Sequence, residues 1–404
     1  MRHAELAKGP LDLPFLMLVL LLLGIGLIML LSASSYAALY EKVAGYNPTE
    51  GKMGDPYYFF KHQAGFALVG VAIMLGISHF DYQKMRIYSV PVLAFSFLLL
   101  ILVKIPGIGV VANHARRWLR IGIFFGPTYQ PSEIAKLGVI LFFAAGLSKR
   151  RSGVPKFKRR LPYYWEQARL LAYQSDLAEL VPYGIVLVLV AGLVAWEPHL
   201  SGAILICAAG ASILFAAGIK LGWFVLGGAL VSAVGWFAIS VLGYNSSRLA
   251  VWMDPWSDPS DTGYQTIQSI YAVSSGGLSG LGFGMSRQKY LYLPEEQNDF
   301  IFAVICEELG FIGATLLVIL FALLVIRGYW LALHSRDRFG SLLVVGITTV
   351  LAVQVFLNMA VVLNLIPNTG ISLPFFSYGG TALLIQLAEM GVILSVSRQI
   401  APPK

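Results

Sequence analysis

Long apolar runs alternate with short polar segments along the whole chain. About ten of these runs have the length, roughly 20 residues, that a helix needs to cross ~30 Å of hydrocarbon. The runs are 13–36, 63–80, 87–104, 131–148, 178–196, 200–218, 221–243, 300–326, 340–364 and 373–396. The pattern predicts an all-α polytopic membrane protein with about ten transmembrane helices, folded as a single domain over residues 1–404.

Composition agrees with this prediction. Of the 404 residues, 57% are hydrophobic and 12% are charged, whereas soluble domains carry about 25% charged residues. The net charge of +8 does not indicate nucleic-acid binding, because the basic residues cluster in short segments between apolar runs. Such segments are typical of chains whose surroundings are membrane lipids.

The segment 148–177 carries most of this charge and predicts the orientation. It holds eight lysines and arginines against Glu166 and Asp176, and such an excess in a short loop is typical of the cytoplasmic side. Counting spans from this basic cytoplasmic loop puts both termini in the cytoplasm. The long segment 244–299, between the seventh and eighth spans, then becomes a large extracytoplasmic loop. Its Asp-Pro steps and glycines predict turns and short helices, with enough apolar residues to fold.

A basic cluster on the same outer side departs from the charge rule. Arg116, Arg117 and Arg120 flank Trp118. Guanidinium groups match phosphate in a two-pronged geometry, so the cluster suits an anionic phosphate or diphosphate. A salt-bridge site or an interfacial anchor explains it equally well.

Acidic residues near the start of the eighth span are the other candidates for chemistry. Asp299 can serve as a general base, hold a divalent cation such as Mg²⁺ or Mn²⁺, or cap the helix with Asn298. At about 100° per residue, Glu307 is closer than Glu308 to the face of Asp299. We expect Glu308 to pair with polar groups on neighbouring helices.

Three polar pairs lie within or beside other spans. Glu133 and Lys136 follow Pro131 at a helix start, where i, i+3 spacing permits a local ion pair or leaves Lys136 free for a substrate. The pairs Gln354/Asn358 and Gln386/Glu389 have spacings that usually hold helices together.

Several cofactor signatures are absent from the sequence. There is no Gly-Lys-Ser/Thr phosphate loop, and the glycines of 280–284 lack the spacing of a dinucleotide site. No nucleotide is therefore expected, and neither His/Glu spacing nor the two cysteines indicate zinc. An outer basic cluster, an outer carboxylate and a helix bundle together suggest a lipid-linked diphosphate substrate.

A series of motifs in order now makes the chain similar to a known family. The motifs are Arg116–Trp118, Gln130–Lys136, Glu197–Gly202, Asp254–Pro259, Gly263–Ser269, Gly276–Glu295, Asp299–Phe302, Glu307–Gly310 and Leu373–Gly380. Together they resemble the SEDS family, the bacterial cell-wall proteins FtsW, RodA and SpoVE, over nearly the whole chain.

The resemblance implies a peptidoglycan glycosyltransferase of the bacterial cytoplasmic membrane. Such enzymes polymerise lipid II, a disaccharide pentapeptide linked to undecaprenyl diphosphate, together with a class B penicillin-binding protein. It implies that Asp299 is catalytic. Candidate substrate-binding residues are Arg116, Arg117, Trp118, Glu133, Lys136, Gln268, Glu307 and Ser377.

Some positions depart from the family pattern. His199 stands where family members often have aspartate, so its role is open. The residues around Ser286 and Tyr292 are more similar to FtsW and SpoVE, whereas Thr369 is more similar to RodA or SpoVE. FtsW or SpoVE is slightly preferred, and elongation, division and sporulation all stay open.

Two other functions fit a helix bundle with buried polar residues. One is a flippase that moves lipid II across the membrane, which pairs of broken helices or inverted repeats would favour; the sequence shows neither clearly. The other is a scaffold that only recruits the penicillin-binding protein, against which Asp299 and the basic cluster argue.

Overall fold

The computed structural model describes residues 9–40, 55–105, 108–112, 115–119, 129–150, 166–167, 171, 174–240 and 246–400. The main helices are α1 (Leu13–Tyr40), α2 (Tyr58–His79), α3 (Tyr82–Leu102), α4 (Pro131–Leu147), α6 (Leu177–Trp196), α7 (Leu200–Ala216), α8 (Leu221–Ser240), α11 (Ile301–Leu333), α12 (Arg338–Val362) and α13 (Gly380–Ser397). Each predicted apolar run overlaps one of them.

Seven of these helices are long and apolar enough to cross a membrane: α1, α2, α3, α6, α11, α12 and α13. Two more, α7 and the apolar part of α8, are shorter apolar helices. The chain is thus a multi-pass membrane protein with a mainly helical fold. The number of crossings, about ten, stays a prediction.

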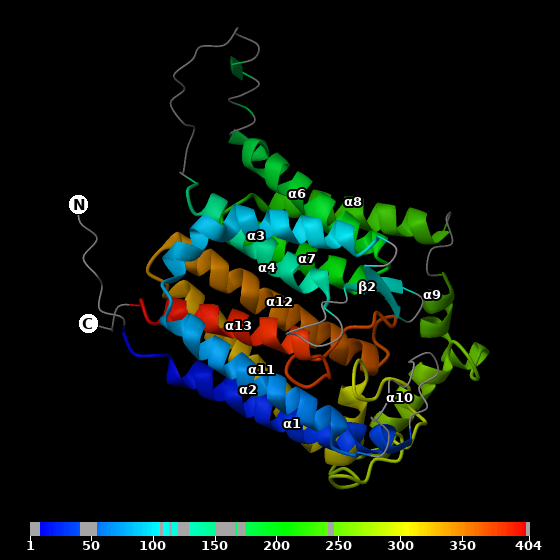
Figure 1. Ribbon diagram of the computed structural model, residues 1–404. Helices are drawn as coiled ribbons and strands as arrows, with labels where there is room; N and C mark the ends of the chain where they lie inside the picture. The colour runs from blue at the N-terminus through cyan, green and yellow to red at the C-terminus, as the bar shows by residue number, and fades with distance from the viewer. Residues whose placement is uncertain are drawn as a thin grey trace.

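The helices lie side by side in one bundle (Figure 1). Helix α12 packs against α11, α7 and α4, while α2 packs against α13 and α3 against α4. The buried side chains of these helices form one large apolar cluster, which includes Phe143, Phe321, Phe339 and Phe376. A well-packed helix interior of this kind gives a rigid frame for polar groups at its ends.

One end of the bundle collects the described ends of the chain and the edges of the basic segment. The amide of Gly9 donates to the carbonyl of Arg398. Arg150 joins the Asp176 carboxylate to the Ala217 carbonyl, which Arg338 also contacts. The opposite end holds α9 (Ser246–Met253) and α10 (Tyr264–Ser275) (Figure 1). The predicted topology, with both termini and the basic loop in the cytoplasm and segment 244–299 outside, stays a prediction.

The basic cluster departs from the all-α prediction. Strand β1 (Gly109–Ala112) pairs in antiparallel register with β2 (Ala115–Leu119), and Val110 lies opposite Trp118. The two β-branched valines and the tryptophan favour a pleated surface over a helix. The side chains of Arg116, Arg117 and Trp118 are therefore presented on a hairpin, while Arg120 lies outside the described residues.

The last predicted span also differs from the structure. Its run begins at residue 373, but α13 begins at Gly380. The residues before it form a non-helical segment whose Leu373, Phe375 and Phe376 side chains are buried in the bundle. Pro374 disfavours a helical conformation at Leu373. The apolar run is thus part core loop and part helix.

Helix α11 is interrupted, which the sequence did not reveal. Gly310 has φ 64° and ψ −168°, a conformation open essentially only to glycine. Across the break, the amides of Phe311 and Ile312 donate to the carbonyls of Gly277 and Leu278 at 2.9 and 3.1 Å. The loop backbone thus fills the interruption, so it is not an open gap of the kind that lines a transport path.

The rest of segment 244–299 is folded. It contains α9, a short 3₁₀ helix (Pro255–Ser257) and α10, and α10 packs against α11. The side chain of Asp254 accepts a hydrogen bond from the Trp256 amide, which begins the 3₁₀ helix. Short helices between glycine-rich turns are what the composition predicts.

Candidate functional site

Asp299 lies just ahead of α11, at the end of the bundle that carries α9 and α10. The N-cap of α11 is Phe300, and no side chain caps the helix. Neither Asn298 nor Asp299 therefore serves as the helix cap that local sequence allows. Asp299 is half-buried, and capping of α11 does not explain the position of its carboxylate.

Burial, and to a lesser degree the nearby Glu295 carboxylate, raises the pKa of Asp299 to about 7. Arg117 acts in the opposite direction. A carboxyl group with such a pKa exchanges a proton near neutral pH, which is the property that a general base requires. Asp299 is thus tuned by one acidic and one basic neighbour.

Arg117 connects the β-hairpin to the end of α6. Its Nε donates to the Glu197 carbonyl at 3.3 Å, and its terminal nitrogen donates to the Pro198 carbonyl. It also acts electrostatically on Asp299, Glu197 and His199. The structure therefore places Arg117 near Asp299. Its bond to Glu197 goes to the backbone carbonyl and not to the carboxylate.

The other two residues of the cluster lie beside Arg117 on β2. Arg116 is close enough to Lys104 to lower the pKa of that ammonium group, although burial is the larger cause. Trp118 is half-buried opposite Val110. Arg116 and Trp118 both lie on the hairpin. Contact of either side chain with a substrate stays a prediction.

Glu197 and His199, both in the Glu197–Gly202 motif, are buried residues to which the sequence assigns no role. Burial raises the pKa of Glu197 to about 8, against the opposing effects of Lys104 and Arg117. Both carboxylate oxygens of Glu197 lack a hydrogen-bond partner within the described residues. Burial, with Arg117 and Lys136, lowers the pKa of His199 to about 3. His199 is therefore neutral, with its Nδ1 3.3 Å from the Gln130 amide nitrogen.

Glu133 and Lys136 form the ion pair that their spacing permits. Lys136 Nζ lies 2.8 Å from Glu133 Oε2 on the first turns of α4, which begins at Pro131 as predicted. Lys136 is 3% exposed. It also acts electrostatically on His199 and on the buried Glu389 of α13. A buried lysine beside two glutamates is a concentrated charge site below the hairpin.

Glu307 does not reach Asp299 through any contact within the described chain. Its carboxylate accepts hydrogen bonds from the Ser286 hydroxyl, from the amides of Arg287 (3.0 Å) and Gln288 (3.3 Å), and from Ser275. These bonds attach the outer loop to α11. Glu307 is thus placed as an anchor of the loop rather than as a group open to a substrate.

Glu308 pairs with neighbouring polar groups, as expected. Ser32 of α1 donates to both of its oxygens at 2.7 and 2.8 Å, and Lys289 Nζ lies 3.0 Å from Oε1. Nothing in the sequence paired Ser32 or Lys289 with Glu308, although Lys289 lies within the family motif Gly276–Glu295. This buried group joins α1, the loop and α11.

Two further candidates lie near the loop. Gln268 is half-buried on α10, and nothing in its described contacts assigns it a role. Ser377 donates to the Asn298 carbonyl at 2.6 Å and accepts from the Leu373 amide at 2.7 Å. Both hydrogen-bonding directions of Ser377 are therefore used inside the protein, next to Asp299.

The described residues offer no group of three or more His, Cys, Asp or Glu that could hold a metal ion. A divalent cation at Asp299, with Glu295 as a second carboxylate, stays a prediction. Such an ion needs only one or two carboxylates when water and substrate phosphates complete its shell. The Glu295 carboxylate raises the pKa of Asp299, and a cation between the two groups would offset this repulsion.

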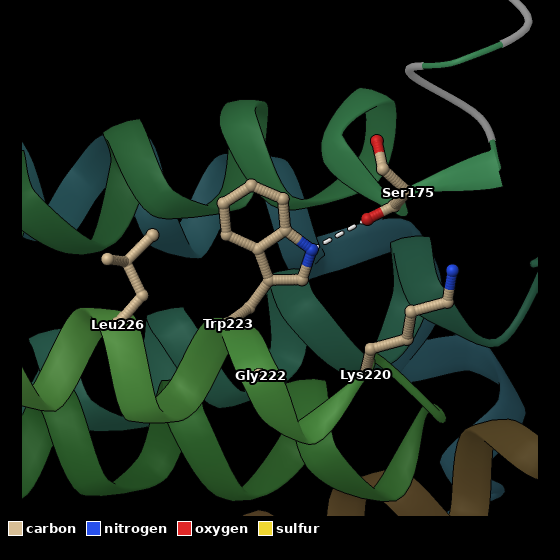
Figure 2. Close-up of a pocket in the computed structure, with 5 residues that line it drawn as sticks. All are labelled: Ser175, Lys220, Gly222, Trp223 and Leu226. Carbon is tan, nitrogen blue, oxygen red and sulfur yellow. Dashed lines mark hydrogen bonds between the residues drawn. The ribbon is translucent and has the colours of Figure 1, made fainter.

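A pocket at the opposite end of the bundle is separate from this site. Its volume is about 310 Å³, and it is lined by Ser175, Lys220, Gly222, Trp223 and Leu226 (Figure 2). The Trp223 indole donates to the Ser175 carbonyl at 2.6 Å. The first turn of α8 thus rests against the residues that precede α6, far from Asp299.

Comparison with known proteins gives similarity over almost the whole chain. Residues 13–401 match the family described as the cell cycle proteins FtsW, RodA and SpoVE. The chain is 40% identical over 392 residues to stage V sporulation protein E of Bacillus subtilis, covering 96% of this chain and 97% of that protein. It is 36% identical to the probable peptidoglycan glycosyltransferase FtsW of Geobacter sulfurreducens, with 96% and 95% covered.

Solved structures agree with these relatives. A chain from a study of a peptidoglycan synthase complex that coordinates polymerization and crosslinking superposes with a TM-score of 0.72 at 25% identity, covering 96% of this chain and 98% of that one. The rod shape determining protein RodA of Thermus thermophilus gives a TM-score of 0.62 at 25% identity, with 97% and 98% covered. This chain belongs to the SEDS family of FtsW, RodA and SpoVE.

Proposed function

We propose that this chain is a peptidoglycan glycosyltransferase that polymerises lipid II at the outer face of the bacterial cytoplasmic membrane. Its relatives include named peptidoglycan glycosyltransferases that match it over nearly their full length. The observation that carries the proposal is the half-buried Asp299, with a pKa near 7, beside Arg117. A base and a cation side by side suit transfer of a sugar from a diphosphate carrier.

In the proposed reaction, the 4-hydroxyl of the acceptor sugar attacks the anomeric carbon of the donor. Asp299 accepts the hydroxyl proton as the new glycosidic bond forms. The bond from the anomeric carbon to undecaprenyl diphosphate breaks, and this carrier leaves with its electron pair. Arg117, with Arg116 and Lys136, stabilises the charge of the departing diphosphate. Asp299 and Glu295 would hold a divalent cation, whose chemistry there would be further neutralisation of the diphosphate charge.

Two other groups have supporting roles in this proposal. Trp118 and Gln268 contact a sugar or the lipid at the membrane surface. The ion pair with Glu133 orients the buried ammonium group of Lys136. A class B penicillin-binding protein is the proposed partner, which agrees with the likeness to a peptidoglycan synthase complex.

Purified protein given lipid II in detergent should form glycan polymer, seen as a ladder on a gel. A flippase and a scaffold make no polymer, because neither breaks the bond between the sugar and the diphosphate or forms a glycosidic bond. Absence of polymer both with and without the penicillin-binding protein would contradict the proposal. Adding a chelator to the same assay tests the role of the divalent cation. An unchanged polymerisation rate after chelation would remove the cation from the mechanism.

The ratio kcat/KM for lipid II, which reports the pKa values of the free enzyme, should rise with pH through about pH 7. A general base acts when ionised, and the Asp299 carboxyl is protonated below that pH. Glu295→Gln removes a negative neighbour, so the midpoint should move to lower pH. Arg117→Ala removes a positive neighbour, so the midpoint should move to higher pH. A midpoint that neither variant moves would assign the titration to another group.

A further inference from the structure

The three residues that lead into α11 are held by their backbone carbonyls. The carbonyl of Gln297 accepts from the Tyr378 amide at 2.9 Å, and that of Asn298 accepts from the Ser377 hydroxyl at 2.6 Å. The carbonyl of Asp299 accepts from the Asn358 amide group at 2.8 Å. Three successive carbonyls thus each receive one donor from outside their own segment.

We propose that Asn358 is a positioning residue that fixes the orientation of Asp299 toward the substrate. Asn358 lies on α12 and is 1% exposed. Its second amide hydrogen donates to the Ile371 carbonyl at 2.7 Å. The inference rests on the proposed catalytic role of Asp299, and it adds a residue that does not itself touch the reacting atoms.

The contact matters because the helix does not fix Asp299. Asp299 precedes the first residue of α11, and no side chain caps that helix. The peptide group between Asp299 and Phe300 is instead held at both ends: its carbonyl accepts from Asn358 at 2.8 Å, and its N–H donates to the Glu295 carbonyl at 3.3 Å. A catalytic group displaced by about 1 Å can lose about 10²-fold in rate.

Asn358 also controls what stands behind the carboxylate. A side-chain carbon at Gly370 would lie 3.3 Å from Asp299 Oδ2, so the backbone of Gly370 lies against the carboxylate. Gly370 has φ 64° and is one residue from Ile371, which Asn358 holds. One amide group therefore fixes both the carboxylate's own backbone and the wall beside it.

Gln354 supplies a matched control on the same helix. It lies one turn before Asn358, is 5% exposed, and donates to the Ser372 carbonyl at 3.1 Å. It holds the same 371–372 segment but has no bond to Asp299 among its described contacts. A purely structural role for these amides predicts equal losses when either is replaced.

The test compares wild type with Asn358→Leu, Gln354→Leu and Asp299→Ala in lipid II polymerisation. We expect Asn358→Leu to lower kcat by about 10- to 100-fold with KM within about twofold, because transition-state geometry is affected and binding is not. Gln354→Leu should stay within about threefold. With Glu295 and Arg117 unchanged, the pH midpoint of Asn358→Leu should move to lower pH, because a displaced Asp299 loses burial.

Each outcome decides a separate point. Equal losses in Asn358→Leu and Gln354→Leu, or a wild-type kcat in Asn358→Leu, would overturn the inference. An active Asp299→Ala protein would instead overturn the proposed function. If Asn358→Leu does not fold, Ser377→Ala decides: a lower kcat with unchanged KM supports the carbonyl contacts as positioning groups, and a wild-type kcat overturns them.

Discussion

Asp299→Ala should reduce lipid II polymerisation by about 10²- to 10⁴-fold, the range that a general base contributes. No other described carboxylate combines the half-buried position, the pKa of about 7 and the proximity of Arg117. The loss should appear in kcat, measured by gel or by release of undecaprenyl diphosphate. The variant should still fold, because removing a carboxylate that resists ionisation leaves no buried charged group without its partner.

The control for this prediction is another aspartate of the same loop. Asp261 is exposed, so Asp261→Asn should keep its activity within about twofold. Asp299→Asn is a stricter test than alanine, since it keeps the shape and removes only the basic oxygen. Wild-type rates in either Asp299 variant would remove this residue from the mechanism and leave Arg117 without a catalytic partner.

The apolar pattern predicted the helices because the ability of a helix to cross a membrane depends on its length and composition. It predicted the boundaries less well where tertiary packing decides. The run from residue 373 is apolar in either conformation, and only the packing of Phe375 and Phe376 shows that its first part is a buried loop. The hairpin at 109–119 was missed because four- and five-residue strands are too short for periodicity to identify.

The candidate site divides in the same way. Asp299 and the Arg116–Trp118 cluster could be named because charges at a membrane surface are conspicuous in a sequence. The proposed positioning role of Asn358 could not be predicted. Its i, i+4 spacing with Gln354 indicated contacts between helices, whereas in the structure both amides donate to backbone carbonyls of loops. Glu307 was expected to approach Asp299 from helical angles alone, but a folded loop intervenes and uses its carboxylate.

Gly310 shows how a single residue can join the loop to the site. The Cα atom of Gly310 lies so close to the loop that an added Cβ would be 2.2 Å from the Gly280 amide nitrogen. In return, a Cβ at Gly280 would lie 2.1 Å from the Glu308 carbonyl oxygen. Two glycines therefore cross at contact distance, and backbone hydrogen bonds such as Leu281 to Glu307 (3.0 Å) close around them.

Gly310→Ala should lower the thermal unfolding midpoint of the purified protein and reduce polymerisation. The backbone conformation alone costs about 1–3 kcal/mol for a residue with a side chain. Relief of the clash must then separate the loop from α11, which weakens the anchors at Glu307 and Glu308 and disturbs Asp299 at the head of the same helix. The matched control is Gly24→Ala in α1, where an added Cβ meets nothing within 4 Å; a helix-interior alanine there should be neutral or stabilising by up to about 1 kcal/mol. Equal midpoints for the two variants would mean that the crossing of Gly280 and Gly310 does not hold the loop in place.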